Sequence, residues 1–161
     1  MKRRHYKKLA SAMALALPGL AYSAASAPQV GYYNEGNPPS RPFTLAVRAG
    51  DYIHLSGQMG TDANGLVPGG FEAQSKKAMD NIEAILKGMN LSMDHIVKCT
   101  VMIVDMGKWG DFNKIYTGYF KPGRLPARSA FGVNALALGG DIEIECLAYA
   151  PVALPAKRGA R

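Results

Sequence analysis

Cysteine and histidine are scarce in this chain, with two Cys and three His among 161 residues. The histidines His5, His54 and His95 are scattered, and the spacing of Cys99 and Cys146 matches no metal motif. We therefore expect neither a metal site nor a cofactor. Both cysteines fall in predicted strands and could pair if those strands are neighbours in an oxidising compartment. Because disulfide geometry is demanding, two buried thiols are the favoured interpretation.

A basic surplus is also missing from the body of the chain, although the formal net charge is +7. Eight of the 19 Lys and Arg residues lie in the first eight or the last five positions. Between Pro28 and Ala156, 11 Lys and Arg stand against 12 Asp and Glu. With no basic stripe, we do not expect a nucleic acid partner.

The one apolar run at the N-terminus is too short to span a membrane comfortably. Basic residues 1–8, apolar residues 9–20 and small residues 21–27 form the three parts of a secretory signal. We expect a signal peptide over 1–27, a periplasmic or secreted protein, and no membrane association after signal removal. The cleavage point stays open between Ala27 and one or two residues earlier. An uncleaved anchor and a misassigned start codon are the alternatives.

Periodicity predicts one domain over residues 43–150, between an extended lead-in (28–42) and a basic, disordered tail (151–161). Strands are expected at 44–49, 52–58, 96–104, around 128–133 and at 142–148, with helices at 71–89 and 109–120. This order predicts a two-layer α+β domain: a mixed sheet with both helices on one face. The aromatic stripe of the second helix is interpreted as core, and His54 as packed or interfacial. Sister subunits are expected to cover the other sheet face.

The stretch Pro126 to Leu147 carries the candidate chemistry. It places Arg128 in one predicted strand and, after a Gly-Gly-Asp turn, Glu143 and Glu145 on one face of the next, which we expect to be its neighbour. A guanidinium suits a substrate carboxylate, and a nearby Glu can hold or activate water. From spacing alone, a structural or interfacial salt bridge between Arg128 and Glu143 is the favoured alternative.

Several separated motifs resemble the Rid family of reactive intermediate deaminases, also called the YjgF or L-PSP family. They occur in the family's order: SGQ at 56–58, a GLVPGGFEAQ-type entry to the first helix, DNIEAIL at 80–86, IVKCTVMIVD at 96–105, a helix with Asn113 and Tyr116, PARS at 126–129 and EIE at 143–145. The resemblance covers about Phe43 to Ala148. It implies a chorismate-mutase-like fold and a homotrimer with clefts between subunits.

The resemblance also implies hydrolysis of 2-imino acids, formed from 2-aminoacrylate and related enamines, to 2-oxo acids and ammonia. Arg128 corresponds to the carboxylate-binding residue and Glu143 to the water-associated acid. Ser56 and Gly57 correspond to the strand-end substrate contact, and Asn113 to a pocket-lining position.

Two substrate-site positions depart from the family pattern. Phe43 stands where the family often has Tyr, and Ala130 where many members have Cys. Because an imine is already electrophilic, we expect catalysis to survive both changes. The competing hypothesis is a non-catalytic periplasmic trimer that binds small carboxylates or proteins. The ribonuclease activity of some family members fits poorly with a near-neutral body and export.

Overall fold

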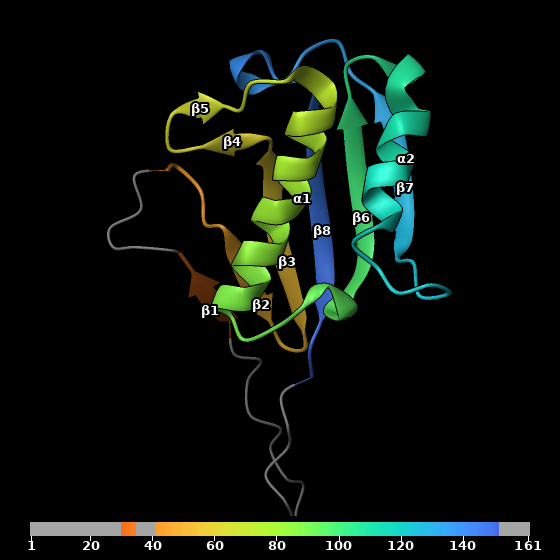
Figure 1. The fold of residues 1–161 in the computed structure, drawn as a ribbon. Helices are drawn as coiled ribbons and strands as arrows, with labels where there is room; N and C mark the ends of the chain where they lie inside the picture. Colours follow the sequence, from red (N-terminus) through yellow and green to blue (C-terminus); the bar gives the residue numbers. More distant parts are fainter. Residues whose placement is uncertain (1–29, 35–40, 152–161) are drawn as a thin grey trace, which may run out of the picture.

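The computed structural model describes residues 30–34 and 41–151. Its main element is a six-stranded mixed sheet with the order β1-β2-β3-β8-β6-β7 (Figure 1). The strands are β1 (Val30–Tyr33), β2 (Ala46–Ala49), β3 (Tyr52–Met59), β6 (Ile96–Ile103), β7 (Ala127–Gly132) and β8 (Ile142–Tyr149). All neighbouring strands are antiparallel except β6 and β7, which are parallel. The α+β class expected from the element order is confirmed.

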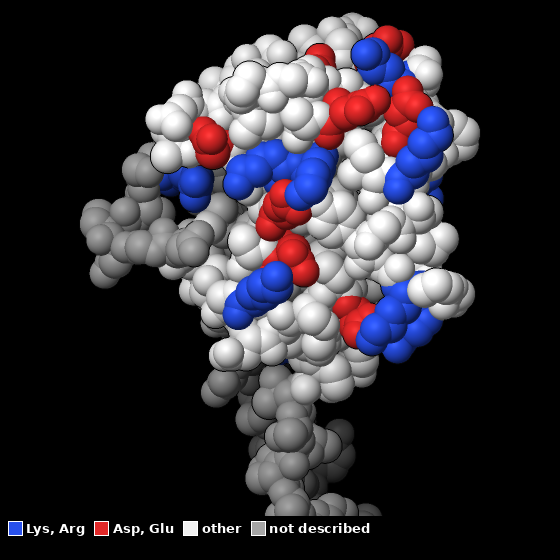
Figure 2. Space-filling model, in the orientation of Figure 1, with Lys and Arg blue, Asp and Glu red and all other residues white. Residues whose placement is uncertain are grey.

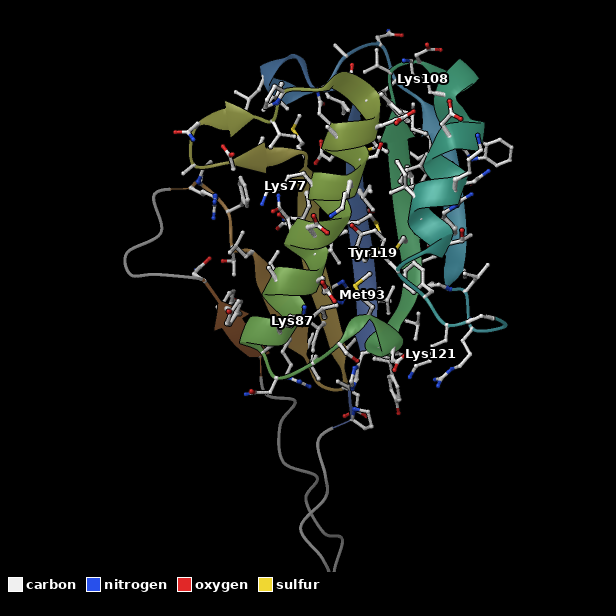
Figure 3. All side chains as sticks on the ribbon, viewed as in Figure 1. Lys77, Lys87, Met93, Lys108, Tyr119 and Lys121 are labelled. Carbon is white, nitrogen blue, oxygen red and sulfur yellow. A yellow bond between two sulfur atoms is a disulfide. The ribbon has the colours of Figure 1, made fainter. Side chains whose placement is uncertain are left out.

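Both long helices, α1 (Gly70–Gly88) and α2 (Trp109–Thr117), cover the same face of the sheet (Figure 1). Their apolar side chains recur at helical spacing and pack on the buried side chains of the strands. Tyr119, just after α2, ties the two helices together (Figure 3): its hydroxyl donates to the Asp80 carboxylate over 2.5 Å. The core therefore lies between the helices and one sheet face. Its fully buried residues include Ala78, Met79, Ile82, Leu86, Phe112, Ile142 and Ile144.

The other face of the sheet, here called the open face, has no cover within the described chain. Strand β8 alternates strictly between buried and more exposed positions, so Ile142 and Ile144 face the helices while Glu143 and Glu145 face outward. Large aromatic side chains also lie on this face. Tyr52 and Tyr149 pair across β3 and β8 with ring centroids 5.3 Å apart and are each more than 40% exposed.

The predicted neighbour relation between the Arg128 strand and the Glu143 strand is wrong. Strand β6 lies between β7 and β8. The reason is the connection through α2: it returns the chain parallel to β6, as a helical crossover between parallel strands requires. The later Gly-Gly-Asp segment then carries the chain across β6 to its other edge, and no hairpin forms.

Two segments expected to lack regular structure contain short strands. Within the predicted lead-in, β1 pairs with β2 in antiparallel register from Val30↔Ala49 to Tyr33↔Ala46. The loop after β3 holds a two-stranded hairpin of β4 (Thr61–Asp62) and β5 (Gly65–Leu66). The four residues of β1 show little alternation of apolar and polar side chains, so their sequence alone does not predict a strand. They form one because they pair with the edge of β2.

The two cysteines form a disulfide, and the interpretation as free thiols is wrong. Cys99 on β6 and Cys146 on β8 are directly opposite each other in the antiparallel register, with Cα atoms 4.1 Å apart. Both side chains point into the core and are at most 5% exposed. Sequence spacing cannot reveal this pairing, because it depends on which strands are adjacent and on their register.

We expect loss of this disulfide to destabilise the fold substantially. Because it closes a loop across 47 residues of separation, the chain-entropy model gives a stabilisation of about 4 kcal/mol. Urea unfolding of the reduced protein, which keeps both sulfur atoms in the core, and of a Cys99→Ala/Cys146→Ala variant should show this loss. Equal midpoints for oxidised and reduced protein would contradict the prediction.

Charges on the helix side of the molecule are mixed in sign. Figure 2 shows Lys and Arg interspersed with Asp and Glu over this face. Ion pairs join several of these charges: Lys76–Asp80, Lys87–Glu83, Lys114–Asp111 and Lys121–Asp94. This face therefore presents no continuous basic surface. None of the helices within the described ranges is both long and apolar enough to cross a membrane. The predicted signal (1–27) and nearly all of the predicted tail (152–161) lie outside the described residues.

Candidate active site

Arg128 lies on β7, the strand at one edge of the sheet, and points toward α2. In the parallel register it is opposite Cys99, whose side chain is also on the helix side. Its Nη2 donates a hydrogen bond of 2.6 Å to the side-chain oxygen of Asn113 on α2. A guanidinium has five N–H donors in a planar fork. The bond to Asn113 therefore fixes one edge of Arg128 and leaves other donors for a ligand.

Three aromatic rings of α2 surround the same guanidinium. Its Cζ lies 4.6 Å from the ring centroid of Tyr116, 5.6 Å from that of Phe112 and 6.0 Å from that of Trp109. Cations within about 6 Å of an aromatic face are attracted by its quadrupole. We call Arg128 with Asn113 and these rings the Arg128 cluster. Burial raises the pKa of the Tyr116 hydroxyl to about 12 despite the opposing effect of the Arg128 charge, so the ring under the guanidinium stays neutral.

Glu143 lies on β8, on the open face, directly over the backbone of Gly57. A Cβ atom placed on Gly57 would overlap the Glu143 carboxylate, so any larger residue there would displace the acid. Gly57 sits where the β3–β8 register shifts, between Leu55 and Gln58. Bulges of this kind redirect side chains near functional sites. The neighbouring Ser56 is held by a 2.6 Å hydrogen bond from its hydroxyl to the carbonyl oxygen of Thr44.

Burial raises the pKa of Glu143 above its usual range, and the charge of Glu145 on the same face adds to this effect. Among the described residues, none forms a hydrogen bond or ion pair with the Glu143 side chain. A half-buried carboxyl group without a partner binds protons more readily than an exposed one. Glu143 therefore has the electrostatic character expected of a group that takes up a proton.

The raised pKa also predicts how stability depends on pH. A carboxyl group with a raised folded-state pKa stabilises the fold while protonated, and this contribution is lost as the pH rises through that pKa. Glutamine stays neutral, so we expect the stability of Glu143→Gln to increase relative to that of the wild type as the pH rises from the ordinary carboxyl value of 4.5 through the raised pKa of Glu143. Urea midpoints of both proteins across this range measure the effect. A difference that does not change with pH would contradict it.

Glu143 and Gly57 form a second cluster, here called the Glu143 cluster, and it lies on the opposite face of the sheet from the Arg128 cluster. Arg128 faces the helices and Glu143 the open face, and no ion pair joins them in the described chain, so the salt bridge does not form within one protomer. Phe43 is 48% exposed, one residue before the Thr44 carbonyl that binds Ser56. Ala130 follows Arg128 on the helix side of β7 and is half-buried. A single chain thus brings Arg128 together with Asn113 and Glu143 together with Gly57. It does not bring these two pairs close to each other.

The sequence interpretation missed the aromatic rings as site residues. Trp109, Phe112 and Tyr116 were assigned to the core stripe of a helix. Phe112 and Tyr116 are indeed buried, at 0% and 3% exposure, but Trp109 is 44% exposed. The available signal was their spacing of three and four residues, on the same helix face as Asn113. That face becomes recognisable as part of a site only when β7 is placed beneath it.

Two further features of the described chain lie outside these clusters. A groove of about 640 Å³ between α1 and α2 is lined by Lys76, Asp80, Tyr119 and their neighbours and contains none of the predicted site residues. Among residues 30–34 and 41–151, no group of three or more His, Cys, Asp or Glu is placed to hold a metal ion.

Known proteins are similar to this chain in both sequence and structure. The mouse 2-iminobutanoate/2-iminopropanoate deaminase is 42% identical over 109 residues, covering 66% of this chain and 80% of the mouse protein. Yeast Mmf1 superposes with a TM-score of 0.69 at 29% identity, over 76% of this chain and 99% of that structure. RidA from an Antarctic Psychrobacter species superposes with a TM-score of 0.64 at 32% identity, over 69% and 90% of the two chains.

The sequence profile described as endoribonuclease L-PSP matches residues 35–150, which include all seven predicted site residues. This match and the 42% identical relative agree with the motif order from the SGQ segment to the EIE segment. The chain is therefore a member of the L-PSP family, also known as the Rid or YjgF family.

Proposed function

We propose that this protein hydrolyses reactive 2-imino acids, such as 2-iminopropanoate formed from 2-aminoacrylate, to 2-oxo acids and ammonia. The observation that carries the proposal is the Arg128 cluster: a guanidinium fixed by Asn113 and aromatic rings, with donors left over for a carboxylate. The similarity to 2-iminobutanoate/2-iminopropanoate deaminases supports an imino acid as the source of that carboxylate.

The proposed site lies between two copies of the chain. Because Arg128 and Glu143 are on opposite sheet faces, a small substrate cannot contact both in one protomer. A second copy whose open face packs against the α2–β7 edge would bring its Glu143 and Gly57 to the Arg128 cluster. The exposed aromatic residues of the open face support such packing, since large exposed apolar patches are typical of interfaces. We propose a homotrimer with such a cleft at each subunit boundary.

The chemistry needs only binding, orientation and proton transfer. Arg128 holds the substrate carboxylate in a two-point contact and thereby presents the imine carbon. The Glu143 carboxylate takes a proton from water, whose oxygen bonds to the imine carbon, and the protonated acid returns that proton to the imine nitrogen, which becomes an amine. Glu143 then takes the proton of the new hydroxyl group and passes it to the amine, so that the carbon–nitrogen bond breaks as the carbonyl forms. Ammonia and a 2-oxo acid leave, and Glu143 returns to its starting charge.

The disulfide supports a site of action outside the reducing cytosol. Such bonds persist mainly in the periplasm and outside the cell, and Cys99–Cys146 is buried in the sheet. We propose that residues 1–27 direct export and are then removed. N-terminal sequencing of protein from the native cell should begin near residue 28, whereas a cytosolic form that starts at Met1 would contradict this.

An assay of the purified protein tests the proposed activity. Generating 2-aminoacrylate enzymatically and trapping the remaining imine with semicarbazide should show faster imine loss and matching ammonia release. Saturable binding of pyruvate without turnover would instead indicate a non-catalytic carboxylate-binding protein. Cleavage of RNA without imine turnover would indicate a nuclease, a role that the acid-paired lysines of the helix face do not favour.

A further inference from the structure

One ring of the Arg128 cluster remains accessible. Trp109, the first residue of α2, is 44% exposed, whereas Phe112 and Tyr116 are buried. Its ring centroid is 6.0 Å from Cζ of Arg128. Core packing accounts for the other two rings but not for this one. Trp109 belongs to the α2–β7 edge, which we propose borders the cleft between subunits, and its ring lies beside the ligand-binding cation.

The surroundings of Arg128 restrict where a substrate can lie. Asn113 occupies one edge of the guanidinium, and the buried rings of Tyr116 and Phe112 occupy the inner side. A carboxylate must therefore approach from the side that these groups leave open, and Trp109, the exposed ring of the cluster, is the one that can border this side. The side chain of a 2-imino acid begins one bond beyond the imine carbon. At the separation of a charge-assisted hydrogen bond, about 2.8 Å between N and O, its atoms come within van der Waals reach of a ring this close.

We propose that Trp109 is the wall that receives the substrate side chain, so that the protein favours imino acids with sizeable apolar side chains, such as those derived from leucine or methionine. This inference rests on the proposed function and names its substrate class. Each methylene group buried against an apolar surface adds only a small factor, so we expect a preference of about tenfold for the leucine-derived over the alanine-derived imine.

Rates with a series of imines test this proposal. Trp109→Ala should lower kcat/KM for the leucine-derived imine by about tenfold, but for the alanine-derived imine by less than about threefold, while Trp109→Phe keeps the preference. Equal losses on both substrates would overturn the proposal and show that Trp109 only supports Arg128. A gain on the larger substrate would also overturn it, because the ring would then be limiting the pocket.

A binding measurement separates this inference from the proposed activity. Trp109 is the single tryptophan of the chain, so its fluorescence reports directly on ligands beside it. We expect 4-methyl-2-oxopentanoate to change the emission at concentrations about tenfold lower than pyruvate. If the protein shows this difference in affinity but no turnover, deamination is refuted, whereas the role of Trp109 as the side-chain wall is supported. Equal affinities, or binding without an emission change, would refute the wall whatever the activity.

Discussion

Arg128→Ala should lower kcat/KM for 2-iminopropanoate by about a hundredfold, because a charge-assisted hydrogen-bond pair to a carboxylate contributes about 1.5–3 kcal/mol. The loss should appear in both KM and kcat, since the same contact binds the substrate and orients its imine carbon. Arg128→Lys keeps the charge but not the planar fork, so it should recover only part of the activity. Steady-state rates over a range of substrate concentrations measure both effects.

Arg124 offers a matched control for this experiment. It is exposed in the connection before β7 and belongs to neither cluster. Arg124→Ala removes the same charge from the same region and should leave kcat/KM unchanged. If Arg128→Ala were as active as Arg124→Ala, the carboxylate would bind elsewhere and the proposed site would be wrong.

Glu143→Gln should lower kcat by a hundred- to ten-thousandfold, the usual contribution of general acid–base catalysis. Glutamine fills the same space over Gly57 but cannot take a proton from water. In the wild type, activity should fall as the pH drops through the raised pKa of Glu143, because only the ionised carboxylate is a base. The dependence of kcat/KM on pH measures this loss of activity at low pH, here called the acid limb of the profile.

Glu145 is the control for the acid, because it lies on the same strand and face but is exposed. Glu145→Gln removes the charge that helps to raise the pKa of Glu143. We expect it to keep most of the activity and to move the acid limb toward lower pH. Full activity of Glu143→Gln would exclude this residue as the base.

Mixing the two inactive variants tests whether the site is shared between subunits. After unfolding and joint refolding of equal amounts of Arg128→Ala and Glu143→Gln chains, random assembly pairs an intact Arg128 with an intact Glu143 in about a quarter of the clefts. Activity should then return to about a quarter of the wild-type value. A mixture as inactive as its components would place both residues in one protomer's site or in none.

The sequence by itself determined the two long helices, five of the six strands of the main sheet and the amphipathic faces of these elements. Alternation in residues 142–148 places Glu143 and Glu145 opposite the isoleucines, and the structure confirms this division. The stripe of α1 and the order of elements were enough to predict a mixed sheet with two helices on one face. These features follow from local periodicity, which depends only on residues a few positions apart.

Only the tertiary structure decided which strands are neighbours. The alternation of side chains along a strand shows which residues of that strand share a face. It does not show which strands are neighbours, or which face of the sheet the residues of another strand share. For this reason the sequence placed Arg128 beside Glu143, whereas the α2 crossover puts β6 between them and turns them to opposite faces. The same register joins Cys99 to Cys146 and sets β7 under the rings of α2. The sequence thus identified the candidate residues, but only the tertiary structure shows that Arg128 and Glu143 lie on opposite faces of the sheet.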